Sequence, residues 1–217
     1  MSHLNQVLLH PNSRVGVDLE CWLAGIGGIG LELALAAPEA IIPLIEAADL
    51  RGLGGSGYPT YLKWRFVAQE SRGGDRYLIC NGNEDEPGTF KDRLLLEQTP
   101  FQILEGATIA ALATRINRII LYINPEMEQQ LGIMAEAIKQ WSATLLVARC
   151  SAYLGQTLRF DLLPSSGHYV GGEETAAIET VEGNFPFPRG KPPFPAQRGV
   201  HGCPTLINNM ETLANVS

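Results

Sequence analysis

The stretch from Gly52 to Gly57 is the densest candidate for ligand binding in this sequence. It holds four glycines in six residues, and a predicted helix that carries Lys63 follows it. Glycines let a backbone adopt positive φ angles and approach a ligand closely. A lysine beside such a loop supplies a point charge to a phosphate that backbone N–H groups already hold. These residues therefore favour phosphate binding, with a flexible turn as the alternative.

Two stretches have the spacing of the dinucleotide fingerprint GxGxxG, at residues 25–30 and 52–57. In that fingerprint a strand precedes the glycines and a helix follows them, because the pyrophosphate binds at the helix N-terminus. Each stretch here follows a predicted helix instead. We therefore interpret the first as a linker between two helices, and we do not expect an ordinary dinucleotide fingerprint at the second.

An amide-rich and acidic loop at residues 81–88 directly follows a predicted strand. Ligands of open α/β sheets bind outside the carboxyl ends of the strands. Asn81 and Asn83 offer both donors and acceptors, which suits the imide edge of a flavin, while Glu84 and Glu86 accept hydrogen bonds from ribose or carboxamide groups. A polar loop without a ligand is the alternative, although it does not account for the position of these residues.

Two predicted helix starts in the last third of the chain carry further candidates. Gly172, Glu173 and Glu174 precede an apolar helix, where the helix macrodipole alone already favours acidic residues. Asn208 and Glu211 form a predicted capping box with Asn208 as the cap. Capping is the alternative to ligand binding there, because exposed amides at a helix N-terminus also bind phosphate.

The order of predicted elements indicates the fold. Residues 17–50 have a helical pattern and follow a patternless stretch at residues 1–16. Strands are predicted at residues 77–80, 119–123, 144–148 and 157–163, with helices at 101–115 and 126–141 and a short helix at the C-terminus. This alternation predicts an α/β fold with a Rossmann-like, open and largely parallel sheet and helices on both faces. We expect an N-terminal helical segment at residues 1–50 and one α/β domain at residues 51–217.

Composition narrows the classes of function. The 217 residues are 45% hydrophobic and carry a net charge of −7, which disfavours nucleic-acid binding. The four cysteines form no CxxC pair, so no local zinc or iron–sulfur motif is expected; Cys80 and Cys203 are interpreted as buried thiols. His168 and His201 receive no role. Neither a secretory signal nor an apolar stretch of about 20 residues is present, so a cytoplasmic protein without a membrane span is expected.

Five blocks, in this order, resemble one protein family: residues 51–64, 80–93, 169–176, 191–195 and 205–216. The chain is similar to the flavin- and NADH-binding subunit of respiratory complex I and to its relatives in NAD-linked hydrogenases and formate dehydrogenases. The resemblance runs from about residue 18 to residue 217. The corresponding subunit of Rnf-type ferredoxin–NAD oxidoreductases shares the glycine loop and matches the later blocks less well.

The resemblance implies an NADH dehydrogenase (diaphorase) module that transfers hydride between NADH and FMN by positioning alone, with no catalytic acid or base and no metal. It implies iron–sulfur electron-transfer subunits as partners, in the cytoplasm or peripheral to a membrane complex. The implied FMN-binding residues are Gly52, Gly54, Lys63, Asn81, Asn83, Glu84, Gly172, Glu173, Asn208 and Asn209. The implied NADH-binding residues are Tyr58, Phe66, Glu86, Glu174, Lys191 and Phe194.

The chain departs from the family pattern at several positions. Leu53 stands where Arg is usual, Tyr58 for Phe, Tyr61 for Gly, Asn83 for Asp and Gly171 for Cys. The ubiquitin-like and iron–sulfur helical domains of the family are not expected here, so this chain is expected to ligate no iron–sulfur cluster. The departures leave two alternatives: a degenerate, non-catalytic structural subunit, or a flavin-binding module with a different electron donor.

Overall fold

The computed structural model describes residues 7–217, so residues 1–6 of the patternless stretch lie outside it. The strands are β1 (Tyr77–Gly82), β2 (Arg118–Ile123), β3 (Arg159–Pro164) and β4 (Thr205–Asn209). The α-helices are α1 (Leu19–Ala24), α2 (Ile29–Ala36), α3 (Ile41–Ala47), α4 (Thr60–Gln69), α5 (Lys91–Gln98), α6 (Pro100–Thr114), α7 (Glu128–Ser142), α8 (Leu145–Leu154), α9 (Glu174–Val181) and α10 (Met210–Ala214). Four 3₁₀ turns complete the elements: η1 (Pro11–Ser13), η2 (Pro38–Ala40), η3 (Tyr169–Gly172) and η4 (Val200–Gly202).

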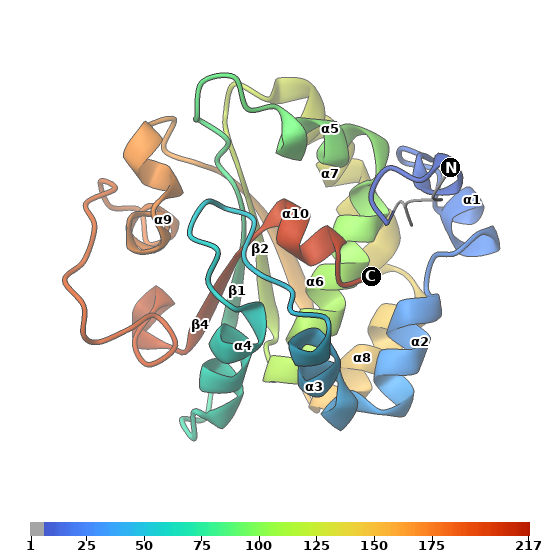
Figure 1. Ribbon diagram of the computed structural model, residues 1–217, viewed down its shortest axis with the longest axis horizontal. Helices are drawn as coiled ribbons and strands as arrows, with labels where there is room; N and C mark the ends of the chain where they lie inside the picture. The colour runs from blue at the N-terminus through green and yellow to red at the C-terminus, as the bar shows by residue number, and fades with distance from the viewer. Residues whose placement is uncertain (1–6) are drawn as a thin grey trace.

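The four strands form one parallel sheet in the order β3-β2-β1-β4. Ile79 in β1 pairs with Ile120 in β2 and Ile207 in β4, so the apolar middle of the sheet is built from buried strands. Such strands are typical of parallel sheets with both faces covered. The α/β class and the parallel sheet predicted from the sequence are confirmed (Figure 1).

One predicted strand is wrong, and one strand of the sheet was not predicted. Residues 144–148 begin helix α8, because Thr144 caps the N-terminus by accepting from the Val147 N–H and the helix runs on to Gly155. A short apolar run does not distinguish a buried strand from a helix. The fourth strand of the sheet is instead β4, in a segment predicted to be loop and capping box.

Helices cover the two faces of the sheet unequally (Figure 1). On one face, Leu78, Leu121 and Leu206 belong to a large core that includes the buried helix α6. On the other face, Ile79 and Tyr122 pack with α9 and η4 in a smaller cluster. The side of α9 is therefore thinly covered, and the segment between β3 and β4 lies there.

The first glycine stretch links α1 to α2, as predicted. A Cβ on Gly27 would lie 2.3 Å from the Trp22 indole, so only glycine lets the chain cross that ring. The buried carboxylate of Glu105 in α6 accepts from the N–H groups of Gly28 at 2.7 Å and Leu31 at 3.1 Å. These bonds hold the N-terminus of α2 on α6. The proposed division of the chain at residue 50 stays a prediction.

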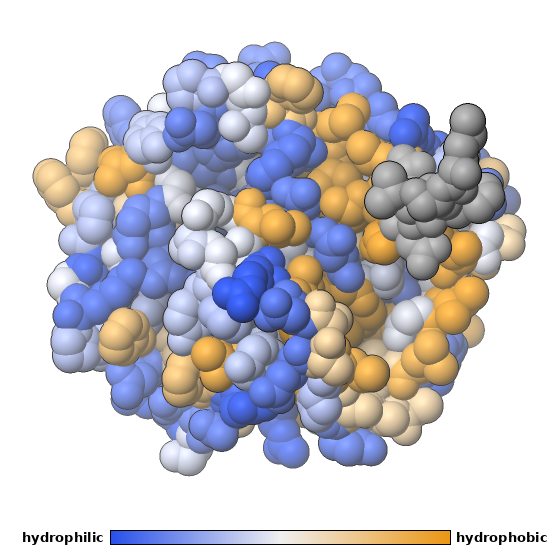
Figure 2. Space-filling model, viewed as in Figure 1, coloured by the Kyte–Doolittle hydropathy of each residue, from blue (hydrophilic) through white to orange (hydrophobic). Residues whose placement is uncertain are grey.

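The surface over the N-terminal helices is apolar. Leu23, Ile29 and Leu33 are 40%, 56% and 69% exposed, and Figure 2 shows hydrophobic residues gathered at the lower right, over α2. Within residues 7–217, no helix combines the length and the apolar character that crossing a membrane requires.

Candidate cofactor-binding site

The order of the strands places a switch point between β1 and β4. The chain leaves β1 toward β2 and β3 on one side, and it returns to the other side of β1 as β4. Asn81 and Asn209 are register partners at the carboxyl ends of these two strands. Ligands of open α/β folds bind in the crevice at such a switch point.

Four segments that are remote in sequence converge on this point. The Asn209 side-chain amide donates to the Asn81 carbonyl at 3.2 Å, and the Asn81 amide donates to the Gly172 carbonyl at 2.9 Å. A Cβ on Gly54 would lie 3.2 Å from the Asn209 Cβ. The glycine loop, the ends of β1 and β4, and the start of α9 therefore meet in one place.

The glycine loop is closed and anchored at its base. The Gly52 N–H donates to the Tyr58 carbonyl at 2.9 Å, and Arg51 forms an isolated bridge with Pro59. The Leu53 N–H donates to the Thr212 hydroxyl at 2.9 Å. Gly55 and Gly57 have φ angles of +111° and +60°, where a residue with a Cβ is strained. The base of the loop is thus fixed against α10.

Asn209, rather than Asn208, caps α10. The Asn209 Oδ1 accepts from the Glu211 N–H at 3.0 Å, so the predicted cap position is wrong by one residue. Asn208 is still part of β4, and its Oδ1 accepts from the Trp64 indole N–H at 2.9 Å. Asn208 therefore binds α4, whereas Asn209 binds the starts of α10 and α5.

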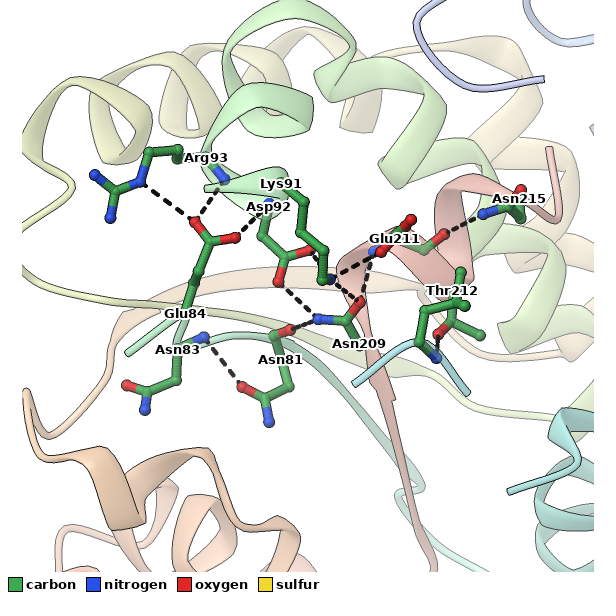
Figure 3. Close-up of polar contacts among 11 residues, drawn as sticks. Asn81, Asn83, Glu84, Lys91, Asp92, Arg93, Asn209, Glu211, Thr212 and Asn215 are labelled. Carbon is green, nitrogen blue, oxygen red and sulfur yellow. Dashed lines mark hydrogen bonds and ion pairs between the residues drawn. The ribbon is translucent and has the colours of Figure 1, made fainter. Parts of the chain in front are cut away.

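A partly buried ionic cluster at the start of α5 holds the Asn209 amide (Figure 3). The Lys91 Nζ contacts Asp92 at 2.9 Å, Glu211 at 3.0 Å and Asn209 Oδ1 at 2.9 Å, while Asp92 accepts from Asn209 Nδ2 at 2.7 Å. Burial lowers the pKa of Lys91, but Asp92 and Glu211 outweigh it and hold that pKa above its ordinary value. Lys91 and Asp92 are not among the predicted site residues, although both lie in the resembling block at residues 80–93.

Glu84 is engaged within the chain. Its buried carboxylate accepts from the Asp92 N–H at 2.6 Å and the Arg93 N–H at 3.2 Å, and it pairs with the Arg93 guanidinium at 3.3 Å. Glu84 thereby satisfies donors at the N-terminus of α5. Its predicted role toward a ligand stays a prediction.

The side chain of Asn83 indicates whether a polar ligand fits at this site. Its side chain is buried, at 4% exposure, and its Oδ1 finds no hydrogen-bond partner anywhere in residues 7–217. A Cβ on Gly172 would lie 3.3 Å from the Asn83 amide nitrogen. A buried acceptor without a donor costs about 1–3 kcal/mol, so a ligand with an N–H or O–H group fits this position. The residues present are therefore compatible with a flavin.

A chain of four charged groups flanks the site. Glu174 contacts the Lys63 Nζ at 3.0 Å and the Lys191 Nζ at 2.5 Å, and Lys191 also contacts Glu173 at 3.2 Å. Burial raises the pKa of Glu174, but Lys63 and Lys191 outweigh burial and hold that pKa below its ordinary value. Glu173 caps α9 by accepting from the Thr175 N–H at 2.7 Å.

The remaining predicted nucleotide-binding residues lie on three segments. Tyr58, Phe66 and Phe194 present aromatic rings that are 40%, 53% and 54% exposed. Glu86 accepts from the Tyr169 hydroxyl at 2.6 Å. The structure thus brings Glu174 and Lys191 into contact and leaves three rings open to solvent.

The structure also shows the surroundings of Gly171, Cys80 and Cys203, which the sequence analysis singled out. A Cβ on Gly171 would lie 2.3 Å from the Ser166 hydroxyl and 3.2 Å from the Tyr122 hydroxyl, so these two groups fill the space of a side chain there. Cys80 is buried as predicted, whereas Cys203 is partly exposed.

The fold and the site together define a parallel α/β domain with polar groups from several segments gathered at its switch point. Residues 45–217 match the family described as the Nuo51 FMN-binding domain (Complex1_51K). The chain therefore belongs to this family.

Similar proteins carry the same domain. The chain is 39% identical over 214 residues to an NADH-quinone oxidoreductase subunit (designated F) of Aquifex aeolicus, covering 98% of this chain and 50% of that protein. It is 40% identical over 200 residues to an NADH-quinone oxidoreductase subunit (designated F 2) of Rhizobium meliloti, covering 91% and 47%. A solved NAD⁺-reducing [NiFe]-hydrogenase in its H₂-reduced state matches with a TM-score of 0.79 and 36% identity, covering 92% of this chain and 34% of that one. The chain spans about half the length of the curated relatives it matches.

Proposed function

We propose that this chain is an FMN-binding module that oxidises NADH and passes the electrons to iron–sulfur partners in a larger redox complex. The observation that carries the proposal is the convergence of Gly54, Asn81, Gly172 and Asn209 at one switch point. Membership of the FMN-binding family supports the identity of the cofactor. The names of the similar proteins support NADH as the donor.

Four segments would hold FMN. The glycine loop, with Gly52 and Gly54, supplies backbone that approaches a ligand closely, and Lys63 supplies a positive charge beside it. Asn81, Asn83 and Asn209 supply amides at the carboxyl ends of the strands. Gly172, Glu173, Glu84 and Asn208 complete the proposed FMN set.

NADH would bind at the exposed edge of the same crevice. Tyr58, Phe66 and Phe194 are partly exposed, so an adenine or nicotinamide ring could reach their side chains and stack there. Glu86 would accept from a ribose hydroxyl, and Lys191 would face the pyrophosphate. Because Lys191 is already paired with Glu174, a bound phosphate would compete with that carboxylate for the same ammonium group.

When bound, FMN supplies the chemistry of accepting a hydride from the nicotinamide ring. The side chains of this chain bind and orient, and none of them is required as an acid or base. Orientation of two rings in contact is worth several powers of ten in rate. Glu173 and Glu174 are paired with Lys63 and Lys191, so these four groups together add no net charge to the site.

The proposed partners are iron–sulfur subunits of a redox complex. Both curated relatives are parts of NADH-quinone oxidoreductases, and the solved relative is part of an NAD⁺-reducing hydrogenase. We place the chain in the cytoplasm, free or peripheral to such a complex.

The proposal is tested on the purified 217-residue chain with added FMN. We expect a visible flavin spectrum that bleaches when NADH is added without oxygen. The variant Asn209→Ala should lose flavin, whereas Asn215→Ala, just after the same helix, where the side chain donates to the Glu211 carbonyl, should keep it. A chain that binds no flavin would instead be a structural subunit, and bound flavin that NADH does not bleach would indicate another donor.

A further inference from the structure

The side-chain amide of Asn83 is held in one orientation. Its Nδ2 donates to the Asp85 carboxylate at 2.5 Å and to the His168 carbonyl at 3.3 Å. The reversed amide would place its oxygen against these two oxygens, with no proton between them. The nitrogen must therefore face Asp85, and the oxygen must face the opposite way.

Asp85 is itself held from the other side. Its second carboxylate oxygen accepts from the side-chain amide of Asn124, which lies just beyond the end of β2. The Asn124 Oδ1 in turn accepts from the Glu126 N–H at 2.8 Å. Asn124 is buried, at 4% exposure, so it has little freedom to turn. A chain of amide and carboxylate groups thus fixes Asn83 from the neighbouring strand.

The Asn83 oxygen is left as a buried acceptor. It has no hydrogen-bond partner within residues 7–217, while the Asn83 N–H binds the Asn81 Oδ1 at 3.1 Å. Figure 3 shows the side chains of Asn81 and Asn83 pointing the same way, away from the Lys91–Asp92 cluster. An oxidised flavin ring carries a single N–H, at its imide, and that group matches one unpaired acceptor.

We propose that Asp85 is a positioning residue that turns the Asn83 amide so that its oxygen, and not its nitrogen, receives the imide N–H of the flavin. This inference rests on the proposed function. Asparagine has both a donor and an acceptor, but the fixed orientation of the Asn83 amide makes the site selective for a ligand that places a donor against the Asn83 oxygen. Burial raises the pKa of the Asp85 carboxyl, which is consistent with its enclosure between Asn83 and Asn124.

The variant Asp85→Asn should reverse the amide. Asn124 would still hold the oxygen of the new amide, so its nitrogen would face Asn83 and require an acceptor there. Asn83 would then present its nitrogen to the ligand, with the His168 carbonyl, now 3.3 Å from the Asn83 nitrogen, opposing the reversal. We expect FMN to bind about tenfold more weakly, and we expect little discrimination between FMN and FMN methylated at the imide nitrogen. The unmodified chain should discriminate clearly in favour of FMN.

Exchanging the residues at positions 83 and 85 should restore the affinity for FMN. Asn83→Asp alone sets two carboxylates against each other and should lower both the melting temperature and the affinity for FMN. In the double variant Asn83→Asp with Asp85→Asn, the new amide at position 85 donates to one carboxylate oxygen at position 83 and leaves the other for the ligand. We expect affinity within about threefold of the unmodified chain. Asp75→Asn is the control, since Asp75 accepts from Asn117 at 2.7 Å in a similar pair outside the site.

The outcomes separate this inference from the proposed function. If Asp85→Asn binds FMN normally, or if the exchanged pair is no better than Asp85→Asn, the positioning role is wrong. If the unmodified chain binds no FMN, the proposed function fails instead. The orientation of the amide is then judged in the apoprotein, where hydrogen exchange of the Asn83 side-chain protons should be slow in the unmodified chain and fast in Asp85→Asn. Equal exchange rates would overturn it.

Discussion

Gly106 in α6 lies so close to Leu213 in α10 that a Cβ on Gly106 would be 1.9 Å from the Leu213 carbonyl oxygen and 2.7 Å from its carbon. Backbone cannot give way as the end of a side chain can. Helix α10 begins directly after Asn209, so the contact between Gly106 and Leu213 fixes the position of Asn209 relative to the sheet.

Gly106→Ala should therefore destabilise the chain by about 3 kcal/mol, through overpacking. Gly132→Ala in α7 is the matched control, since a Cβ there meets nothing within 4 Å. Alanine in an exposed helix interior should raise stability by about 0.5–1 kcal/mol. Urea unfolding followed by circular dichroism measures both. Equal effects of the two substitutions would show that α10 is free to move away from α6.

Glu105 is expected to hold the N-terminal helices on the core. Glu105→Ala removes the acceptor of the Gly28 and Leu31 N–H groups and leaves two buried donors unpaired. We expect a loss of about 3 kcal/mol in the free energy of unfolding and faster proteolysis within residues 15–50. Glu136→Ala, on the exposed face of α7, should change neither measurement. Protection of residues 15–50 in Glu105→Ala would contradict the anchoring role.

The ion pairs of Glu174 with Lys63 and Lys191 predict how the stability of the protein changes at acidic pH. The pKa of Glu174 is lower in the folded chain than its ordinary value, because Lys63 and Lys191 outweigh burial. The unfolded chain therefore binds more protons, so this stabilisation is present above pH ~4.3 and is lost as the pH falls through the lowered pKa.

Glu174→Gln should make the loss of melting temperature below pH ~4.3 shallower. Lys63→Met should move that loss to higher pH, because it removes one of the charges that lower the pKa of Glu174. Melting curves recorded between about pH 3 and pH 7 check both. Glu128→Gln, at an exposed site on α7, serves as the control. If both variants lose melting temperature at low pH in the same way as the unmodified chain, the ion pair between Glu174 and Lys63 does not contribute to stability.

Thiol reactivity should separate the four cysteines into two pairs. Cys80 is buried in β1 and burial raises its pKa, while burial raises the pKa of Cys150 to about 12. Cys21 is exposed and Cys203 is partly exposed. A thiol reagent at about pH 8 should therefore label Cys21 and Cys203 in the native chain and all four thiols in urea. Early labelling of Cys80 would indicate that β1 opens readily.

The sequence correctly predicts those helices, strands and linkers that are defined by residues close together in the chain. The helix after the glycine loop, the strands at β1 and β2 and the linker at residues 25–30 are found where expected, because glycine spacing and apolar runs define them. Residues 144–148 fail because an apolar run of five residues suits both a strand and a helix. Thr144 is a residue type that caps helices, and this signal should have been weighed against the apolar run.

The site is harder to predict because it depends on β4. Two of the five residues of β4 are asparagines, which are uncommon in strands, and the strand exists through its pairing with β1. Without β4, neither the switch point nor the capping role of Asn209 is apparent. The Lys91–Asp92 cluster was missed for the same reason, because its partners Asn209 and Glu211 lie at the end of that strand and just after it.

The last strand also decides when the switch point between β1 and β4 forms. Asn81 and Asn209 are 128 residues apart, and β4 enters at an edge of a sheet whose other three strands are already adjacent in sequence order. During synthesis, β1 to β3 can pair before β4 is available to pair with β1. Loop closure over such a distance is slow compared with local pairing, so the contact between Asn81 and Asn209 forms only after residue 209 has emerged from the ribosome.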